Sequence, residues 1–118
     1  MDRPGERMWL ASERLRSSLE EAIGLTRIRI ELSRPDGPRR IEFVDAAHVV
    51  DGDPRHAHLR ARPAASISVP LRDGDVVLGS VTIEDARRGW YPPEALGEMI
   101  RITAEHAHAF HEGSAAAA

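Results

Sequence analysis

Histidine and arginine side chains are the groups in this 118-residue chain best suited to binding chemistry. His56 and His58 lie two positions apart, and His48 stands a short distance upstream. Three imidazoles gathered on one folded loop could ligate a metal ion or reach a haem iron. Their spacing does not force a ligand set, however, and histidines on a short surface helix are the commoner arrangement. Metal or haem binding is therefore kept as an alternative.

A second histidine pattern lies near the C-terminus. Glu105, His108 and His111 follow one another at three-residue spacing, which places side chains near each other on a helix. This spacing can build a surface metal site. A solvated helix face is the favoured interpretation, because His108 projects outside the predicted apolar stripe and His111 lies at its rim.

The densest basic patch comprises Arg55, Arg60 and Arg62 with the two histidines between them. Guanidinium groups can hold a phosphate or carboxylate through paired hydrogen bonds. Nearby Asp51 and Asp53 offer balancing charge, so a solvated loop is the favoured interpretation of this patch.

The residue types that are missing exclude several functions. The chain contains no Lys, Asn, Gln or Cys, and its formal net charge is -3. A Walker-type phosphate loop requires Lys, and thiolate metal sites and disulfides require Cys. No basic field favours nucleic acid, and the amide side chains that read adenine are absent. We therefore expect no nucleic-acid partner.

Catalytic arrangements are also poorly supported. Glu84 and Asp85 are adjacent at the end of a predicted strand, so their carboxylates should point to opposite faces rather than converge on a substrate. Ser80 follows Gly79, but the segment continues as a strand and not as a nucleophile elbow. Gly79 is instead expected to permit close packing beneath a helix. We expect no enzymatic activity.

The elements that must position these residues are clearest after residue 65. Residues 66–71 and 76–83 are predicted strands joined by an Asp-Gly hairpin turn at Asp73 and Gly74. A helix is predicted from Pro93, because two prolines suit a first helical turn. Its predicted apolar stripe consists of six residues at helical spacing: Leu96, Met99, Ile100, Thr103, Ala107 and Phe110.

Further elements are predicted upstream. Residues 7–23 form an amphipathic helix that Gly24 should end. Residues 25–32 alternate, with Ile28, Ile30 and Leu32 on one face and Arg27, Arg29 and Glu31 on the other. Residues 40–44 form its hairpin partner, 48–50 a short strand, and a short helix starts after Asp53. The three charged residues predict a partly wet sheet face.

The stretch Ser68-Val-Pro-Leu-Arg-Asp-Gly-Asp-Val-Val-Leu-Gly-Ser-Val-Thr-Ile83, followed by Trp90-Tyr-Pro-Pro-Glu-Ala-Leu96, resembles the C-terminal half of a GAF domain. The likeness extends upstream to Val49-Val-Asp51 and Asp53-Pro-Arg55. It implies an α+β fold in which a central antiparallel sheet of about five strands, in the order 2-1-5-4-3, carries the first and last helices on one face.

The resemblance implies a non-catalytic sensory or regulatory domain in signal transduction. A ligand would bind the sheet face opposite the helices, where the candidate residues are Arg29, Phe43, His48, His56, His58 and Arg60. The chain between the second and third strands is shorter than in fully developed members, so the usual cover of that face is reduced. The Asn-Lys motif of cyclic-nucleotide-binding members and the Cys needed for bilin attachment or methionine-sulfoxide reduction are absent.

Trp9 and Leu10 lie off the apolar stripe of the first helix. GAF-like domains often pair through their terminal helices, so these two residues are candidates for a homodimer interface. We expect a regulatory domain that acts through a helix-mediated homodimer or a partner protein. The alternative is a sensor for an organic effector, haem or metal, and the sequence names no cofactor.

The expected organisation is a polar lead-in over residues 1–6, one GAF-like domain over 7–111 and a tail over 112–118. No apolar run approaches the roughly 18 residues of a transmembrane helix, and the first residues do not resemble a signal peptide. A cytoplasmic location without membrane contact is expected.

Overall fold

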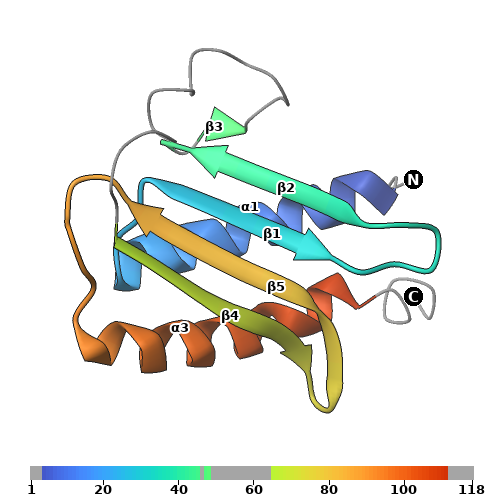
Figure 1. The fold of residues 1–118 in the computed structure, drawn as a ribbon. Helices are drawn as coiled ribbons and strands as arrows, with labels where there is room; N and C mark the ends of the chain where they lie inside the picture. Colours follow the sequence, from blue (N-terminus) through green and yellow to red (C-terminus); the bar gives the residue numbers. More distant parts are fainter. Residues whose placement is uncertain (1–3, 46, 49–64, 112–118) are drawn as a thin grey trace.

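The computed structural model describes residues 4–45, 47–48 and 65–111. In chain order the elements are α1 (Pro4–Ala22), β1 (Arg27–Leu32), β2 (Arg39–Val44), β3 (Ala47–His48), β4 (Ala65–Asp73), β5 (Val76–Asp85), α3 (Pro93–His106) and the 3₁₀ helix η2 (Ala107–Phe110). Figure 1 shows one sheet with both long helices behind it. The predicted α+β class is therefore confirmed.

The sheet is antiparallel and has the order β3-β2-β1-β5-β4. Four strands of six to ten residues make up most of it, and β3 adds two residues beside β2. The predicted order, which set the third strand beside the fourth, is wrong for this strand. Ala47 and His48 pair with Val44 and Phe43 at the opposite edge. The connection from Val44 is too short to cross the sheet, and Asp45, with φ of 49°, turns the chain back at once.

The two helices run in opposite directions across one face of the sheet (Figure 1) and pack against each other. The hydrophobic core lies between them and the sheet. It includes apolar side chains from α1, all four long strands, α3 and η2, among them Leu15, Leu19, Ile28, Ile30, Phe43, Leu71, Val81, Ile83, Met99, Ile102 and Phe110. The predicted alternation of residues 27–32 is confirmed, because Ile28, Ile30 and Leu32 are all buried in this core.

Helix α3 starts as predicted, with Pro93 in its first turn and Glu94 beside it. Its predicted apolar stripe is partly wrong. Met99 and Thr103 are buried, but Leu96 and Ile100 are 47% and 53% exposed, and Ala95 and Ile102 are buried instead. Both sets satisfy helical spacing, and the buried set is rotated toward α1 and β4, which α3 packs against.

Two glycines have a clear structural role. Gly24 ends α1 with φ of 94°, and its N–H donates to the carbonyl of Leu19 at 3.2 Å, as the sequence predicts. Gly79 was expected to permit packing beneath a helix, and this expectation is wrong. The glycine instead permits close pairing of two strands. A Cβ atom at this position would lie 1.8 Å from the backbone oxygen of Glu31, so only glycine lets β5 approach β1 beside the bulge at Leu71 and Arg72.

Candidate functional site

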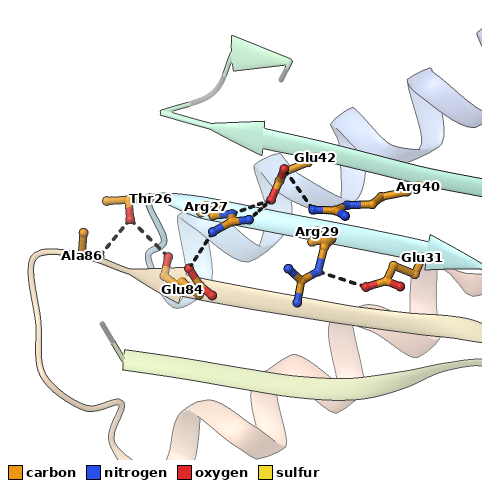
Figure 2. A network of polar contacts seen from close by, with 8 residues as sticks. All are labelled: Thr26, Arg27, Arg29, Glu31, Arg40, Glu42, Glu84 and Ala86. Atoms are coloured by element: carbon orange, nitrogen blue, oxygen red, sulfur yellow. Dashed lines mark hydrogen bonds and ion pairs between the residues drawn. The ribbon is translucent and has the colours of Figure 1, made fainter. Parts of the chain in front are cut away.

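Polar side chains occupy the face of the sheet that the helices leave uncovered. Arg27, Arg29 and Glu31 of β1 point to this face, as their alternation predicts, and side chains of β2 and β5 join them (Figure 2). Register explains the grouping, because Arg29 of β1 stands opposite Glu42 of β2 and Thr82 of β5. We call Arg27, Arg29, Glu31, Arg40, Glu42 and Glu84 the sheet-face network.

Arg27 forms the centre of this network. Its buried guanidinium forms an ion pair and hydrogen bond with buried Glu42, and its Nη1 lies 3.4 Å from Oε2 of Glu84. Glu42 also lies 3.4 Å from Nη2 of Arg40. Two positive and two negative charges thus balance across three strands. Removing one partner of such a buried pair typically costs about 3–5 kcal/mol, because it leaves an uncompensated charge.

Thr26 fastens the end of the network where β1 begins. Its hydroxyl donates to the carbonyl of Glu84 at 3.3 Å and accepts from the N–H of Ala86 at 2.8 Å (Figure 2). Its own N–H also donates to the Glu84 carbonyl. These bonds hold the backbone of Glu84 at the distance that its carboxylate needs to reach Arg27.

Arg29 has unused donor capacity. Its Nε lies 3.0 Å from Oε1 of Glu31, but the two do not meet the directional requirement of a hydrogen bond, so this buried atom has no hydrogen-bond partner. The side chain is partly exposed. A guanidinium can pair with a carboxylate or phosphate, so the exposed part of the Arg29 side chain offers a place for an added anion on this face.

The other predicted ligand residues do not join Arg29 in the part of the chain that the structure describes. Phe43 is 1% exposed and lies in the core on the helix side, opposite Ile28, so its expected place on the ligand face is wrong. The strand register explains the difference, because Glu42 stands opposite Arg29 and Phe43 stands opposite buried Ile28. The backbone of His48 pairs with Phe43 in β3. His56, His58 and Arg60 lie outside the described residues.

A second polar cluster joins the β4–β5 hairpin to η2. Nδ1 of His108 and Nδ1 of His111 lie 3.0 Å and 2.7 Å from the same oxygen, Oδ2 of Asp73. Hydrogen bonds from His108 first and His111 second lower the pKa of Asp73. Glu105, the expected neighbour of these histidines, instead forms an ion pair with Arg101 at 2.7 Å.

A third cluster surrounds Asp85 after β5. The buried Asp85 carboxylate accepts from Nε of Arg87 at 2.9 Å and lies 3.0 Å from Nε of Arg88, and these arginines, Arg87 first, lower its pKa. Tyr91 packs beneath Arg88 and donates to the carbonyl of Gly24 at 2.9 Å. Glu84 and Asp85 thus face different partners, as predicted, and do not form an acid–base pair.

Sequence reasoning missed two parts of these sites. It placed Arg27 on the correct face but not Glu42 or Glu84 beside it, since strand register decides which residues become neighbours. It also missed Asp73 as the partner of His108, because the two are 35 residues apart and meet only through the fold.

The five-element sheet and paired terminal helices define a small α+β domain in which the described helices leave one sheet face uncovered. The sequence profile of the GAF domain matches residues 7–108, and the chain therefore belongs to the GAF domain family. GAF domains are generally sensory or regulatory domains of signalling proteins, and they typically regulate without catalysing a reaction.

No curated protein and no solved structure shows significant similarity to the chain. Among the helices in the described ranges, none is both long and apolar enough to cross a bilayer.

Proposed function

We propose that this GAF domain is a non-catalytic regulatory domain that acts through a homodimer formed by its helices. The observation that carries the proposal is the exposure of apolar side chains on the helical layer. Trp9 and Leu10 are each 44% exposed on α1, and Ile100 is exposed on α3. Trp9 and Leu10 lie off the buried face of α1, which Ala11, Leu15 and Leu19 form.

A second copy of the chain suits this surface. In a two-fold dimer the same apolar patch of both copies becomes buried. A large aromatic residue such as Trp9 is the kind of residue that anchors interfaces. The charges on the layer do not oppose this. Arg101 pairs with Glu98 at 2.8 Å and with Glu105, and Arg16 pairs with Glu13 and Glu20. Two helical layers could thus approach with little net repulsion.

The sheet-face network supports the same conclusion. Small-ligand pockets are mostly apolar, with a few polar groups placed to orient the ligand. Here Arg27, Glu42 and Glu84 bind one another across the strands. A ligand that separated them would leave buried charges unpaired, which is unfavourable by several kcal/mol. This face therefore serves as a structural layer in the proposed mechanism.

Substitution of Leu10 by Glu tests the dimer. The added charge should prevent burial of the α1 surface and convert the dimer to monomer, as measured by size-exclusion chromatography with multi-angle light scattering. Val77→Glu is the matched control, because Val77 is similarly exposed but lies on the β4–β5 hairpin. A monomeric wild type, or a Leu10→Glu variant that remains dimeric, would contradict the proposal.

A small-ligand sensor is the second candidate, and the unsatisfied Nε of Arg29 favours it. An anionic effector bound to the exposed part of this side chain would pair with the guanidinium without opening the Arg27 pairs. Native mass spectrometry of the protein purified from its own source separates the two functions. A retained organic mass that Arg29→Ala loses would support the sensor, whereas a dimer with no added mass would support the interaction domain.

A further inference from the structure

Asp73, His108 and His111 bring together three metal-binding side chains from two distant parts of the chain. Asp73 ends β4 at the tip of the hairpin, His108 lies in η2, and His111 follows η2 directly. One donor atom from each lies within 4.8 Å of the other two. The two imidazoles are nearly perpendicular, at 88°, so neither ring blocks the other's access to the shared carboxylate.

The spacing of the donor atoms is close to what a tetrahedral ion requires. Zinc binds imidazole nitrogen and carboxylate oxygen at about 2.0–2.2 Å, so neighbouring donors on a tetrahedral ion lie roughly 3.3 Å apart. The Asp73 oxygen lies 3.0 Å from the His108 nitrogen and 2.7 Å from the His111 nitrogen. One donor atom of each residue lies within 4.8 Å of the other two, so small side-chain movements that lengthen both contacts to Asp73 would bring the three donors toward ligand spacing.

We propose that Asp73, His108 and His111 form a binding site for a zinc-class transition-metal dication, with water completing the coordination. The proposal is independent of the dimer and of Arg29, since neither contributes a residue to it.

The donor set indicates which ion fits. Two imidazole nitrogens and one carboxylate suit Zn²⁺, Co²⁺ and Ni²⁺, whereas Mg²⁺ and Ca²⁺ prefer oxygen ligands alone. Each histidine would bind the ion through the lone pair of neutral Nδ1, with its proton on Nε2. The ion then takes the place of the two hydrogen bonds that now converge on Asp73. No electron transfer is involved.

The site is open to solvent. The side chain of His108 is 72% exposed, and those of His111 and Asp73 are partly exposed. An ion can therefore enter without unfolding any element. Three protein ligands leave one tetrahedral position for water. Because the ligands come from the hairpin and from the end of the helical layer, bound metal would tie these two parts together.

Isothermal titration calorimetry with ZnCl₂ tests the proposal on the full chain, prepared without a polyhistidine tag and stripped with a chelator. One equivalent of Zn²⁺ should bind, and Mg²⁺ should not. His108→Ala and His111→Ala should each weaken Zn²⁺ binding at least about tenfold, the lower end of the loss seen even when residues behind the ligands are changed.

Two controls locate the ion. His106→Ala removes a histidine of α3 that belongs to no part of the cluster, and Glu105→Ala removes the carboxylate paired with Arg101. Both should retain the wild-type affinity. Absence of Zn²⁺ binding up to about millimolar concentration, far weaker than the affinity of structural zinc sites, would overturn the proposal. Unchanged binding in the double variant His108→Ala/His111→Ala would also overturn it, because other histidines would then hold the ion.

A second measurement guards against loss of folding in the variants. Co²⁺ bound in a tetrahedral site absorbs visible light, so the wild type should gain a visible band that both histidine variants lose. Circular dichroism in chelator should show all variants folded. If His111→Ala unfolds, His108→Ala decides the question, because its side chain is mostly exposed and removing it disturbs no core packing.

Discussion

Tyr91 is the single tyrosine of the chain and reports on one partly buried environment. Its hydroxyl donates to the Gly24 carbonyl, where α1 ends, and its ring packs beneath Arg88. Burial first and the charge of Asp85 second raise the pKa of Tyr91 to about 12. The residue thus links the end of α1 with the loop that leads from β5 to α3.

An ultraviolet absorbance titration should therefore show phenolate forming near pH 12 and not near the ordinary value of about 10. A raised pKa means that the folded state favours the neutral phenol. This contribution to stability is complete below about pH 10 and is lost as the pH rises toward 12. Tyr91→Phe should remove the signal. A midpoint near 10 while circular dichroism still shows a folded protein would contradict the described burial.

At the residue scale, the sequence predicted which face of the sheet a side chain lies on, but not which residues it contacts. Alternation placed Arg27, Arg29 and Glu31 on one side, and the positive φ of Gly24 followed from its position after a helix. The neighbours of these residues depend on register and topology. The sequence alone places Phe43 on the wrong face. In the six residues of β2, charged side chains occur in both alternating sets, so the pattern does not show which set faces the core.

At the element scale, α3 shows how far periodicity can mislead. Met99 and Ile100 are adjacent apolar residues, but Met99 is fully buried against the core and Ile100 is largely exposed. Helical spacing alone allows either residue to belong to the buried apolar stripe of α3. The sheet and α1 decide the rotation of the helix, and Ala95 with Ile102 extends the buried side.

This difference makes a matched pair of substitutions informative. Met99→Ala should lower the free energy of unfolding by roughly 2–5 kcal/mol, because it opens a cavity in the core. In the Leu10→Glu background, in which the proposed dimer cannot form, Ile100→Ala should change it by no more than about 0.5 kcal/mol, as for most surface positions. Urea denaturation of both variants measures the contrast. Similar losses at the two positions in that monomeric background would mean that the helix is rotated from its described orientation.

The strands were predicted more accurately than their arrangement. The Asp-Gly turn and the alternating segments defined β1, β4 and β5 to within a few residues, because both signals are local. The position of β3 was not predictable from such signals. It depends on the tight turn at Asp45, which sends the chain to the edge beside β2.

At the scale of the whole molecule, β1 and β5 are the inner strands of the four long ones and are covered by the helices on one face. Their amides should exchange with deuterium most slowly, at rates set by global unfolding. The outer half of β4 and the β2–β3 turn should exchange sooner. Hydrogen exchange with mass spectrometry measures this order, and equal protection of edge and central strands would contradict the described topology.

The α+β class and the helical layer were thus predictable from sequence, since amphipathic helices must cover an apolar sheet face. The composition of the uncovered face was only half predictable. A charged strand indicated a polar surface there, but the closed set of ion pairs around Arg27 required three strands in register.

Helix α1 contacts η2, and both ends of the described fold lie on one side of the molecule (Figure 1). This has a mechanical consequence. Tension applied through the two ends would separate the helix contacts one after another, starting from that side. It would not pull the strands past one another. The helical layer would therefore detach at low force while the strand ladders still carried no load.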